Sequence, residues 1–166
     1  MKIFLIGMPG CGKTTLGRIA AGILNIKFKD MDEEIERREG KTVAEIFQEV
    51  GESGFRDIET EVLKAEILST DNEIVSCGGG VVVREENIEL LQNSGAEVIY
   101  IYRPIEKIAE DIECSKRPLM KNGSEALYKL YEQRSKRYNR ACSGKIVNDS
   151  DVRHGVSALI RLIRSR

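Results

Sequence analysis

The sequence lacks the paired cysteines of a zinc site and the dense cysteine framework of a small secreted protein. Its four cysteines lie far apart, at Cys11, Cys77, Cys114 and Cys142, and no two of them form a C-x-x-C pair. It also lacks an apolar run near the roughly 18 residues that cross a membrane, and the apolar run at residues 2–6 is not followed by a cleavage signature. These absences predict free thiols, no membrane partner and a cytoplasmic location.

Neither sign of charge is in excess. The 26 Lys and Arg residues nearly cancel the 27 Asp and Glu residues, which gives a formal net charge of −1. No overall field therefore attracts nucleic acid, and any anion must be bound by a local group of residues. The chain has 166 residues, 41% of them hydrophobic, and contains no repeat or low-complexity tract. This length predicts a single domain, residues 1–166, around one core.

Short apolar runs alternate with segments of helical period, which is the pattern of βαβ units and predicts an α/β fold with a parallel sheet covered on both faces. Strands are expected at residues 2–6, 26–29, 73–77, 97–102 and 145–147. Helices are expected at residues 13–24, 31–39, 42–50, 54–68, 84–93, 105–112, 125–141 and 153–163. Ligands of such sheets bind beyond the carboxyl ends of the strands, so the residues that follow each strand are the most informative.

A phosphate-binding loop follows the first strand directly. Residues 7–14 read Gly-Met-Pro-Gly-Cys-Gly-Lys-Thr, which is the G-x-x-x-x-G-K-[ST] pattern at the start of a helix. Its glycines let backbone N–H groups converge on phosphate oxygens, with Lys13 reaching the β- and γ-phosphates and the Thr14 hydroxyl binding Mg²⁺. The loop alone does not distinguish a kinase from a GTPase or an ATPase. The expected nucleotide-binding residues of this segment are Gly10, Cys11, Gly12, Lys13, Thr14 and Thr15.

Two carboxylates, Asp30 and Asp32, follow the second strand. At that position they point into the crevice near the phosphates, where one can hold Mg²⁺ through water and the other can face an acceptor hydroxyl. An Asp at a helix start is also a common cap, and the spacing alone leaves both interpretations open. The neighbouring phosphate loop favours the functional one.

Three glycines, Gly78, Gly79 and Gly80, follow the third strand. They are tolerated where a ligand must approach bare backbone N–H groups, although a flexible turn is the simpler explanation. Arg56 stands one helical turn before Glu59, a spacing that orients a guanidinium but is more often an exposed pair. Arg134, Arg137 and Arg140 recur at helical spacing, so one face of their helix can present a guanidinium fork to a carboxylate, and a solvated face is the alternative.

A polar segment with Pro and Gly, residues 113–124, separates two expected helices. Such a segment can close over bound nucleotide as a lid, which would bring Arg117 onto the transferring phosphoryl group. An ordinary surface loop is the alternative.

The chain resembles the shikimate kinase family in the order of its motifs. These are the phosphate loop, Asp30-x-Asp32, Phe55-Arg56, Gly78–Gly80, Arg117-Pro118-Leu119 and the late arginine helix. The resemblance extends from Lys2 to about Arg153. It implies a three-layer α/β/α fold with a five-stranded parallel sheet, of the nucleoside-monophosphate-kinase type with a mobile lid. The implied reaction is ATP-dependent phosphorylation of the shikimate 3-hydroxyl, in the pathway to chorismate and the aromatic amino acids.

The resemblance also implies roles for individual residues. Lys13 is the catalytic lysine, Thr14 and Asp30 form the Mg²⁺ environment, and Asp32 grips the shikimate hydroxyls and takes the proton. Arg56 and Arg134 bind the carboxylate, Gly78–Gly80 supply backbone donors within the acceptor site, and Arg117 contacts phosphate from the lid. Residues 31–60 form the shikimate-binding region, and the protein is a monomer. Where some members place an arginine against adenine this chain has Glu110, which leaves Arg153 as the substitute.

Two other functions remain open from the residues alone. A kinase of the same fold acting on a nucleoside monophosphate or gluconate is the nearest, although a phosphate-bearing acceptor usually calls for more arginines and does not explain Gly78–Gly80. A P-loop switch that binds a protein partner is more distant. Such a switch carries a strand-end Asp and a base-specificity motif, and neither follows residues 74–76.

Overall fold

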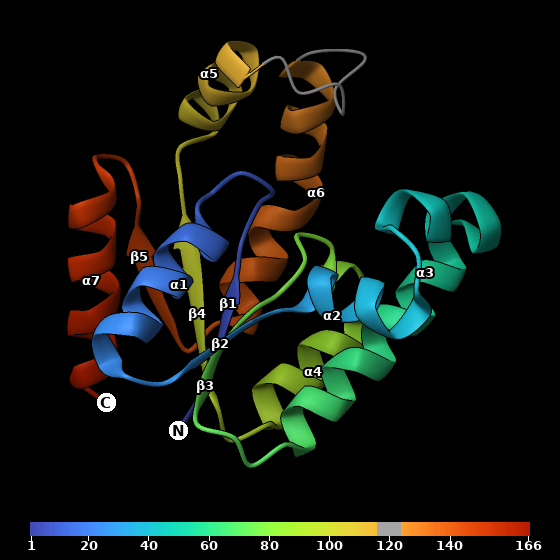
Figure 1. The fold of residues 1–166 in the computed structure, drawn as a ribbon. Coiled ribbons are helices and arrows are strands. Elements are labelled where there is room, and N and C mark those ends of the chain that lie inside the picture. The colour runs from blue at the N-terminus through green and yellow to red at the C-terminus, as the bar shows by residue number, and fades with distance from the viewer. Residues whose placement is uncertain (116–123) are drawn as a thin grey trace.

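The computed structural model of the protein describes the backbone of residues 1–115 and 124–166, with the side chains of residues 1–112 and 124–166 (Figure 1). Five strands form one sheet in the order β2-β3-β1-β4-β5, and every neighbouring pair is parallel. The strands are β1 (Lys2–Ile6), β2 (Lys27–Asp30), β3 (Glu73–Ser76), β4 (Glu97–Tyr102) and β5 (Gly144–Val147). The central strand β1 is fully buried from Ile3 to Ile6, as a parallel strand covered on both faces must be.

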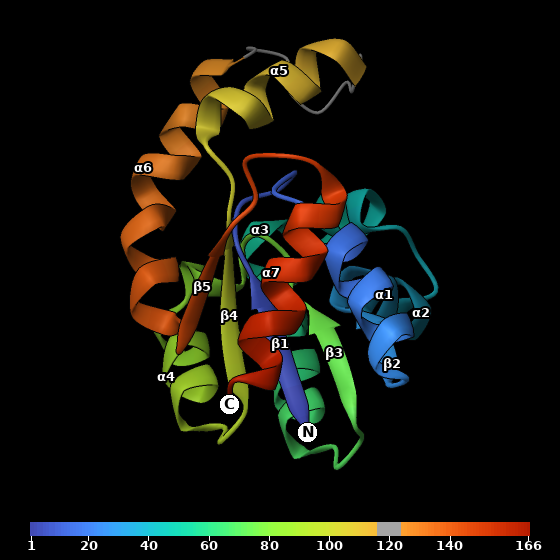
Figure 2. The same ribbon diagram turned by 90° about the vertical axis from the view of Figure 1, so that its left-hand side faces the viewer.

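Helices cover both faces of the sheet. They are α1 (Lys13–Leu24), α2 (Met31–Glu39), α3 (Val43–Leu68), α4 (Glu85–Asn93), α5 (Ile105–Ser115), α6 (Ser124–Ala141) and α7 (Val152–Arg164), with a 3-10 turn η1 (Val81–Val83). Helices α1 and α7 pack together on one face, and α3, α4 and α6 cover the other (Figures 1 and 2). No described helix is both long and apolar enough to span a membrane. The predicted α/β/α fold with a five-stranded parallel sheet is confirmed.

Helix α1 lies unusually close to the sheet because its interior contains Gly17. A methyl group at Gly17 would lie 2.8 Å from Leu5 of β1 and 2.8 Å from Phe28 of β2. The small residue therefore lets the start of α1 settle against the carboxyl ends of these two strands. This close packing brings Thr14, in the first turn of α1, within reach of Asp30 at the end of β2.

The prediction of two helices at residues 42–50 and 54–68 is confirmed, because α3 consists of two helical segments separated by a kink at Gly51. The φ of Gly51 is 71°, in the left-handed region that glycine adopts easily. The turn folds the first part of the helix back on the second, so that Phe47 stacks on Phe55 with ring centroids 4.4 Å apart. The helix begins with a capping box formed by Thr42 and Glu45.

A buried charge network ties the amino-terminal side of the sheet together. Glu73 of β3 is fully buried and lies 2.5 Å from the ammonium of Lys2 and 3.6 Å from that of Lys29. Lys29 also binds Glu66 of α3 at 2.8 Å. Because Glu73 is desolvated, both lysines and the fold around them depend on its charge.

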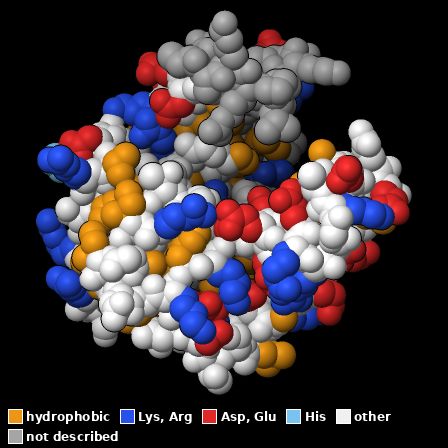
Figure 3. Space-filling model, viewed as in Figure 1, with side chains coloured by type: hydrophobic (Ala, Val, Ile, Leu, Met, Phe, Trp, Pro, Cys, Tyr) orange, Lys and Arg blue, Asp and Glu red, His pale blue; other side chains and the backbone are white. Residues whose placement is uncertain are grey.

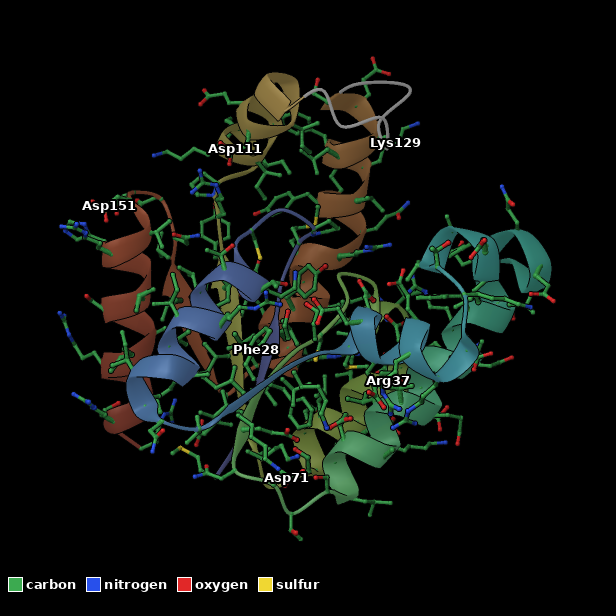
Figure 4. The ribbon with its side chains drawn as sticks, in the orientation of Figure 1. Phe28, Arg37, Asp71, Asp111, Lys129 and Asp151 are labelled. Carbon is green, nitrogen blue, oxygen red and sulfur yellow. The ribbon has the colours of Figure 1, made fainter. Side chains whose placement is uncertain are left out.

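We expect Glu73→Gln to lower the free energy of unfolding by about 2–4 kcal/mol, because it leaves the largely buried ammonium of Lys2 without its counter-charge, whereas Lys29 keeps Glu66. Chemical denaturation monitored by circular dichroism measures the difference. The matched control is Asp71→Asn, which removes a carboxylate from the exposed Lys27–Asp71 pair at the same end of the molecule (Figure 4) and should leave stability unchanged. Equal effects of the two substitutions would contradict the role given to burial.

Candidate active site

The phosphate-binding loop, residues 7–12, joins β1 to α1 and is held open by glycines. Gly10 and Gly12 have φ angles of 80° and 101°, which residues with a Cβ rarely adopt. The ammonium of Lys13 is buried and donates to the carbonyls of Gly7 at 2.9 Å and Met8 at 3.0 Å. The loop borders a cavity of about 490 Å³, a volume suited to a small-molecule ligand. Its lining residues are Gly10, Gly12, Lys13, Thr14, Thr15, Ile108, Asp111 and Ile112.

Asn148, just after β5, contacts this loop. It was not predicted as a site residue from the sequence. Its side-chain amide is buried and donates to the Cys11 carbonyl at 2.9 Å. Its backbone N–H donates to Tyr102 at the end of β4 at 2.7 Å. A methyl group at Gly12 would lie 2.6 Å from the Asn148 amide nitrogen. The second glycine of the motif is therefore required by this contact as well as by its φ angle.

Asp30 serves two partners at once. One carboxylate oxygen accepts hydrogen bonds from the backbone N–H groups of Asp32 at 3.0 Å and Glu33 at 3.4 Å, which caps α2. The other accepts from the Thr14 hydroxyl at 2.7 Å. The cap and the link to the phosphate loop are thus both present. The Thr14 hydroxyl also lies 3.3 Å from that of Ser76, the last residue of β3, which was not among the predicted site residues.

Asp32 lies among charges of both signs. Burial is the main cause that raises the pKa of its carboxyl above the ordinary value, and the negative charge of Asp30 adds to this effect. Lys13 and Arg56 oppose it. Figure 3 shows Asp and Glu side chains gathered on the surface over α2, the helix that carries Asp32. A carboxylate held in this setting is a stronger proton acceptor than an exposed one.

Arg56 and Glu59 form a buried ion pair, so the interpretation of this spacing as an exposed pair was wrong. The guanidinium donates to the Glu59 carboxylate at 2.7 Å, and the two residues are 7% and 1% exposed. Burial raises the pKa of Glu59, while the charge of Arg56 holds it down. The pair is incompletely satisfied, because Arg56 Nε and Glu59 Oε1 have no hydrogen-bond partner among the described residues.

The three glycines after β3 are each required by a different neighbour. A methyl group at Gly78 would lie 3.0 Å from the carboxylates of Asp32 and Glu59. At Gly79 it would lie 2.7 Å from the Pro9 ring of the phosphate loop, and at Gly80 it would lie 2.2 Å from the Arg56 guanidinium. The segment is therefore packed closely and is not a flexible turn. It joins the phosphate loop to the Arg56–Glu59 pair.

Helix α6 contributes arginines to the same region. Arg134 donates to the Gly79 carbonyl at 3.2 Å. Arg137 donates to the carbonyls of Val82 and Val83 of η1 at 3.2 and 3.3 Å. Arg140 pairs with Glu85 of α4 at the surface, where its side chain is 51% exposed, so the solvated-face interpretation holds for Arg140. A second cavity of about 330 Å³ lies here and borders Glu52, whose carboxylate is 3.8 Å from the Arg56 guanidinium. Its lining residues are Glu52, Val83, Gln133, Arg134 and Arg137.

Two further nucleotide contacts were predicted from the sequence. Arg117 and most of the expected lid, residues 113–124, lie outside the described residues. Arg153 is exposed in the first turn of α7, two residues after Asp151, which caps the helix (Figure 4). Cys11 is fully buried within the phosphate loop, and together with Cys77 and Cys142 it is a free thiol.

The arrangement joins a phosphate-binding loop to a pocket flanked by guanidinium groups, at the carboxyl edge of a parallel sheet. Lys13, Asp32, Arg56 and Arg134 all lie at this one edge, as predicted. A phosphate loop next to a second, acceptor-sized pocket defines a P-loop kinase.

Comparisons with known proteins define this class more narrowly. The family model described as shikimate kinase matches residues 9–164. A shikimate kinase of Clostridium botulinum (strain Eklund 17B / Type B) is 50% identical over 162 residues, which are 98% of this chain and 96% of that protein. The solved structure of shikimate kinase from Acinetobacter baumannii in complex with shikimate has a TM-score of 0.90 at 34% identity and covers 99% of this chain and 93% of that chain. The chain belongs to the shikimate kinase family.

A more distant likeness concerns the fold alone. The structure of a deoxyadenosine kinase from M. mycoides has a TM-score of 0.62 at 16% identity, with 99% of each chain covered. The two chains share a fold, and a fold alone does not identify the acceptor.

The electrostatics of Asp32 predict an unusual stability effect. The pKa of the Asp32 carboxyl is higher in the folded protein than in the unfolded chain, so the folded protein binds this proton more tightly. As the pH rises through the interval between the two pKa values, the carboxyl therefore lowers the free energy of unfolding. We expect Asp32→Asn to raise the midpoint of thermal unfolding at pH 7 by a few degrees. The gain should shrink as the pH falls toward 3.8, the ordinary pKa of an aspartate.

The matched control is Glu33→Gln, because Glu33 is an exposed carboxylate on the same turn of α2. Its substitution should give no gain in the unfolding midpoint at any pH. A lower midpoint for Asp32→Asn at pH 7 would show that the charge of Asp32 is compensated in the folded state.

Proposed function

We propose that this protein transfers the γ-phosphoryl group of ATP to the 3-hydroxyl of shikimate, and that it does so in the cytoplasm as a monomeric single-domain enzyme. The observation that carries the proposal is the contact between Gly79 and Pro9, which brings the phosphate loop against the glycine segment that lies on Asp32 and Arg56. Family membership and the shikimate complex of the A. baumannii relative support the choice of acceptor. The reaction needs both ligands at one edge of the sheet.

The nucleotide half of the site consists of the loop and the first turn of α1. Gly10, Cys11, Gly12, Thr14 and Thr15 supply backbone N–H groups at a helix N-terminus, where phosphate oxygens are favoured. On binding, Lys13 leaves the carbonyls of Gly7 and Met8 for the β- and γ-phosphates. Arg117, from a lid at residues 113–124, contacts the transferring group, and Arg153 contacts the base side.

Thr14 and Asp30 fit a Mg²⁺ ion. Their hydroxyl and carboxylate are hard oxygen donors 2.7 Å apart beside the phosphate loop. The described residues hold no group of three or more His, Cys, Asp or Glu suited to a metal, which agrees with an ion held by one or two protein oxygens, water and substrate phosphates. When bound, the ion neutralises charge on the phosphates.

The acceptor half is formed by residues 31–60, the glycine segment and α6. Arg56 and Arg134 bind the carboxylate of shikimate, and the backbone N–H groups of Gly78–Gly80 bind its oxygens. Asp32 grips the ring hydroxyls and receives the proton of the reacting one, for which its raised pKa suits it. Because phosphoryl transfer passes through a loose transition state, positioning and charge neutralisation account for most of the rate.

One assay tests the proposal. ADP release from ATP and Mg²⁺ should accelerate strongly with shikimate and stay near its basal rate with nucleoside monophosphates or gluconate. Lys13→Ala should abolish the shikimate-dependent rate, because no other described cation reaches into the loop. Equal stimulation by a nucleoside monophosphate would assign the protein to the other acceptor class, and slow ADP release insensitive to all acceptors would indicate a P-loop switch.

Arg56→Lys should raise the KM for shikimate about 10- to 100-fold, because a hydrogen bond to a charged group is lost while positive charge stays beside Glu59. The KM for ATP should change less than about twofold. Arg84→Lys is the control, since Arg84 is a nearby arginine that pairs with Asp57 and the Ser53 carbonyl. A normal KM for shikimate in Arg56→Lys would move the acceptor carboxylate to another site.

A further inference from the structure

Tyr138 of α6 is a buried residue to which the proposed reaction gives no role. Its ring is stacked on Tyr100 of β4 with centroids 5.2 Å apart, and the residue is 0% exposed. Its hydroxyl donates to the Gly79 carbonyl at 2.5 Å and lies 3.9 Å from the sulfur of Met8 in the phosphate loop. One hydroxyl group thus contacts both halves of the site.

The carbonyls of the glycine segment are all occupied. Gly78 accepts a hydrogen bond from the Val81 N–H at 3.1 Å, and Gly80 accepts one from the Val83 N–H at 2.9 Å. The Gly79 carbonyl accepts two, from Tyr138 and from Arg134. By contrast, no oxygen of residues 1–112 or 124–166 accepts a hydrogen bond from the backbone N–H of Gly79 or Gly80. The segment therefore presents a donor face with no protein partner in the described structure.

Peptide geometry links the carbonyl of Gly79 to the N–H of Gly80. The two groups belong to one planar trans peptide, in which the carbonyl and the N–H point in opposite directions. Because the carbonyl points to Arg134 and Tyr138 on α6, the Gly80 N–H points away from α6. Its own Cα lies against the Arg56 guanidinium, since a methyl group there would be 2.2 Å from it. The N–H and the guanidinium can therefore meet the same anion.

We propose that Tyr138 is a positioning residue for the acceptor. Its hydroxyl, together with Arg134, fixes the Gly79–Gly80 peptide so that the Gly80 N–H is presented next to Arg56 to a small carboxylic acid. This inference rests on the proposed function and adds a residue that does not touch the substrate. Without the hydroxyl the Gly79 carbonyl keeps only its hydrogen bond from Arg134, so the direction of the Gly79–Gly80 peptide is held less tightly.

Burial keeps the hydroxyl in its donating form. It raises the pKa of Tyr138 far above the ordinary value, and the positive charges of Arg134 and Arg56 only partly oppose this shift. The hydroxyl therefore remains protonated at every pH at which the protein works.

The test is Tyr138→Phe, which removes one oxygen atom and keeps the ring in its stack. We expect the KM for shikimate to rise about 3- to 10-fold, as for the loss of one neutral hydrogen bond, with the KM for ATP and the unfolding midpoint unchanged. Calorimetric titration with shikimate alone should show the same loss of affinity. Tyr100→Phe is the matched control, since Tyr100 is a buried partner in the same stack whose hydroxyl does not contact Gly79, and it should leave both KM values unchanged.

Each other result counts against the inference. A normal KM for shikimate in Tyr138→Phe overturns it directly. A parallel rise in both KM values, a large fall in the unfolding midpoint or a failure to fold overturns it too, because the hydroxyl would then support the fold and not the direction of one peptide. A wild-type protein that does not phosphorylate shikimate refutes the proposed function together with this inference, and that failure is visible before any variant is compared.

Discussion

The site depends on one close approach, that of Gly79 to the Pro9 ring. A single methyl group at Gly79 would lie 2.7 Å from that ring, which is closer than two side chains can pack. The absence of a side chain lets the segment after β3 lie directly on the phosphate loop. The neighbouring glycines repeat the same constraint toward the carboxylates of Asp32 and Glu59 and toward the guanidinium of Arg56. Backbone contact, and not a long side chain, thus sets the separation between the two ligand pockets.

Burying charged side chains this close together costs free energy of desolvation. The protein nevertheless keeps them, although some of their polar atoms have no hydrogen-bond partner among the described residues. Burial raises the pKa values of both Asp32 and Glu59, and one atom each of Arg56 and Glu59 lacks a hydrogen-bond partner among the described residues. A core selected only for stability would replace such a pair with apolar side chains. Buried polar atoms without a partner call for an explanation, and a region shaped for a ligand that completes them is one.

The sequence predicted the features that depend on neighbouring residues. It did not predict the contacts that depend on packing between segments far apart in the chain. The phosphate loop, the capping box at Thr42 and nearly all strand and helix positions follow from local residues, and the structure confirms them. The spacing of Arg56 and Glu59 was visible, but a three-residue spacing does not tell whether the pair is buried. Ser76, Tyr138 and Asn148 act on partners 62, 59 and 137 residues away. Of these, Ser76 alone had a usable signal, since it pairs in register with Asp30 at the end of the neighbouring strand.

The balance of charge around the proposed acceptor pocket argues for the kind of acceptor it suits. Arg56 and Arg134 supply two positive charges beside the glycine segment, and Asp32 and Glu59 supply two negative charges against it. A phosphate monoester, with nearly two negative charges, would meet little net attraction there. A hydroxylated monocarboxylic acid carries one negative charge, which a guanidinium and a backbone N–H can bind together. Its hydroxyl groups can also donate hydrogen bonds to the two carboxylates, which would repel a phosphate. Under the proposed function, the two acidic residues therefore disfavour a phosphate-bearing acceptor.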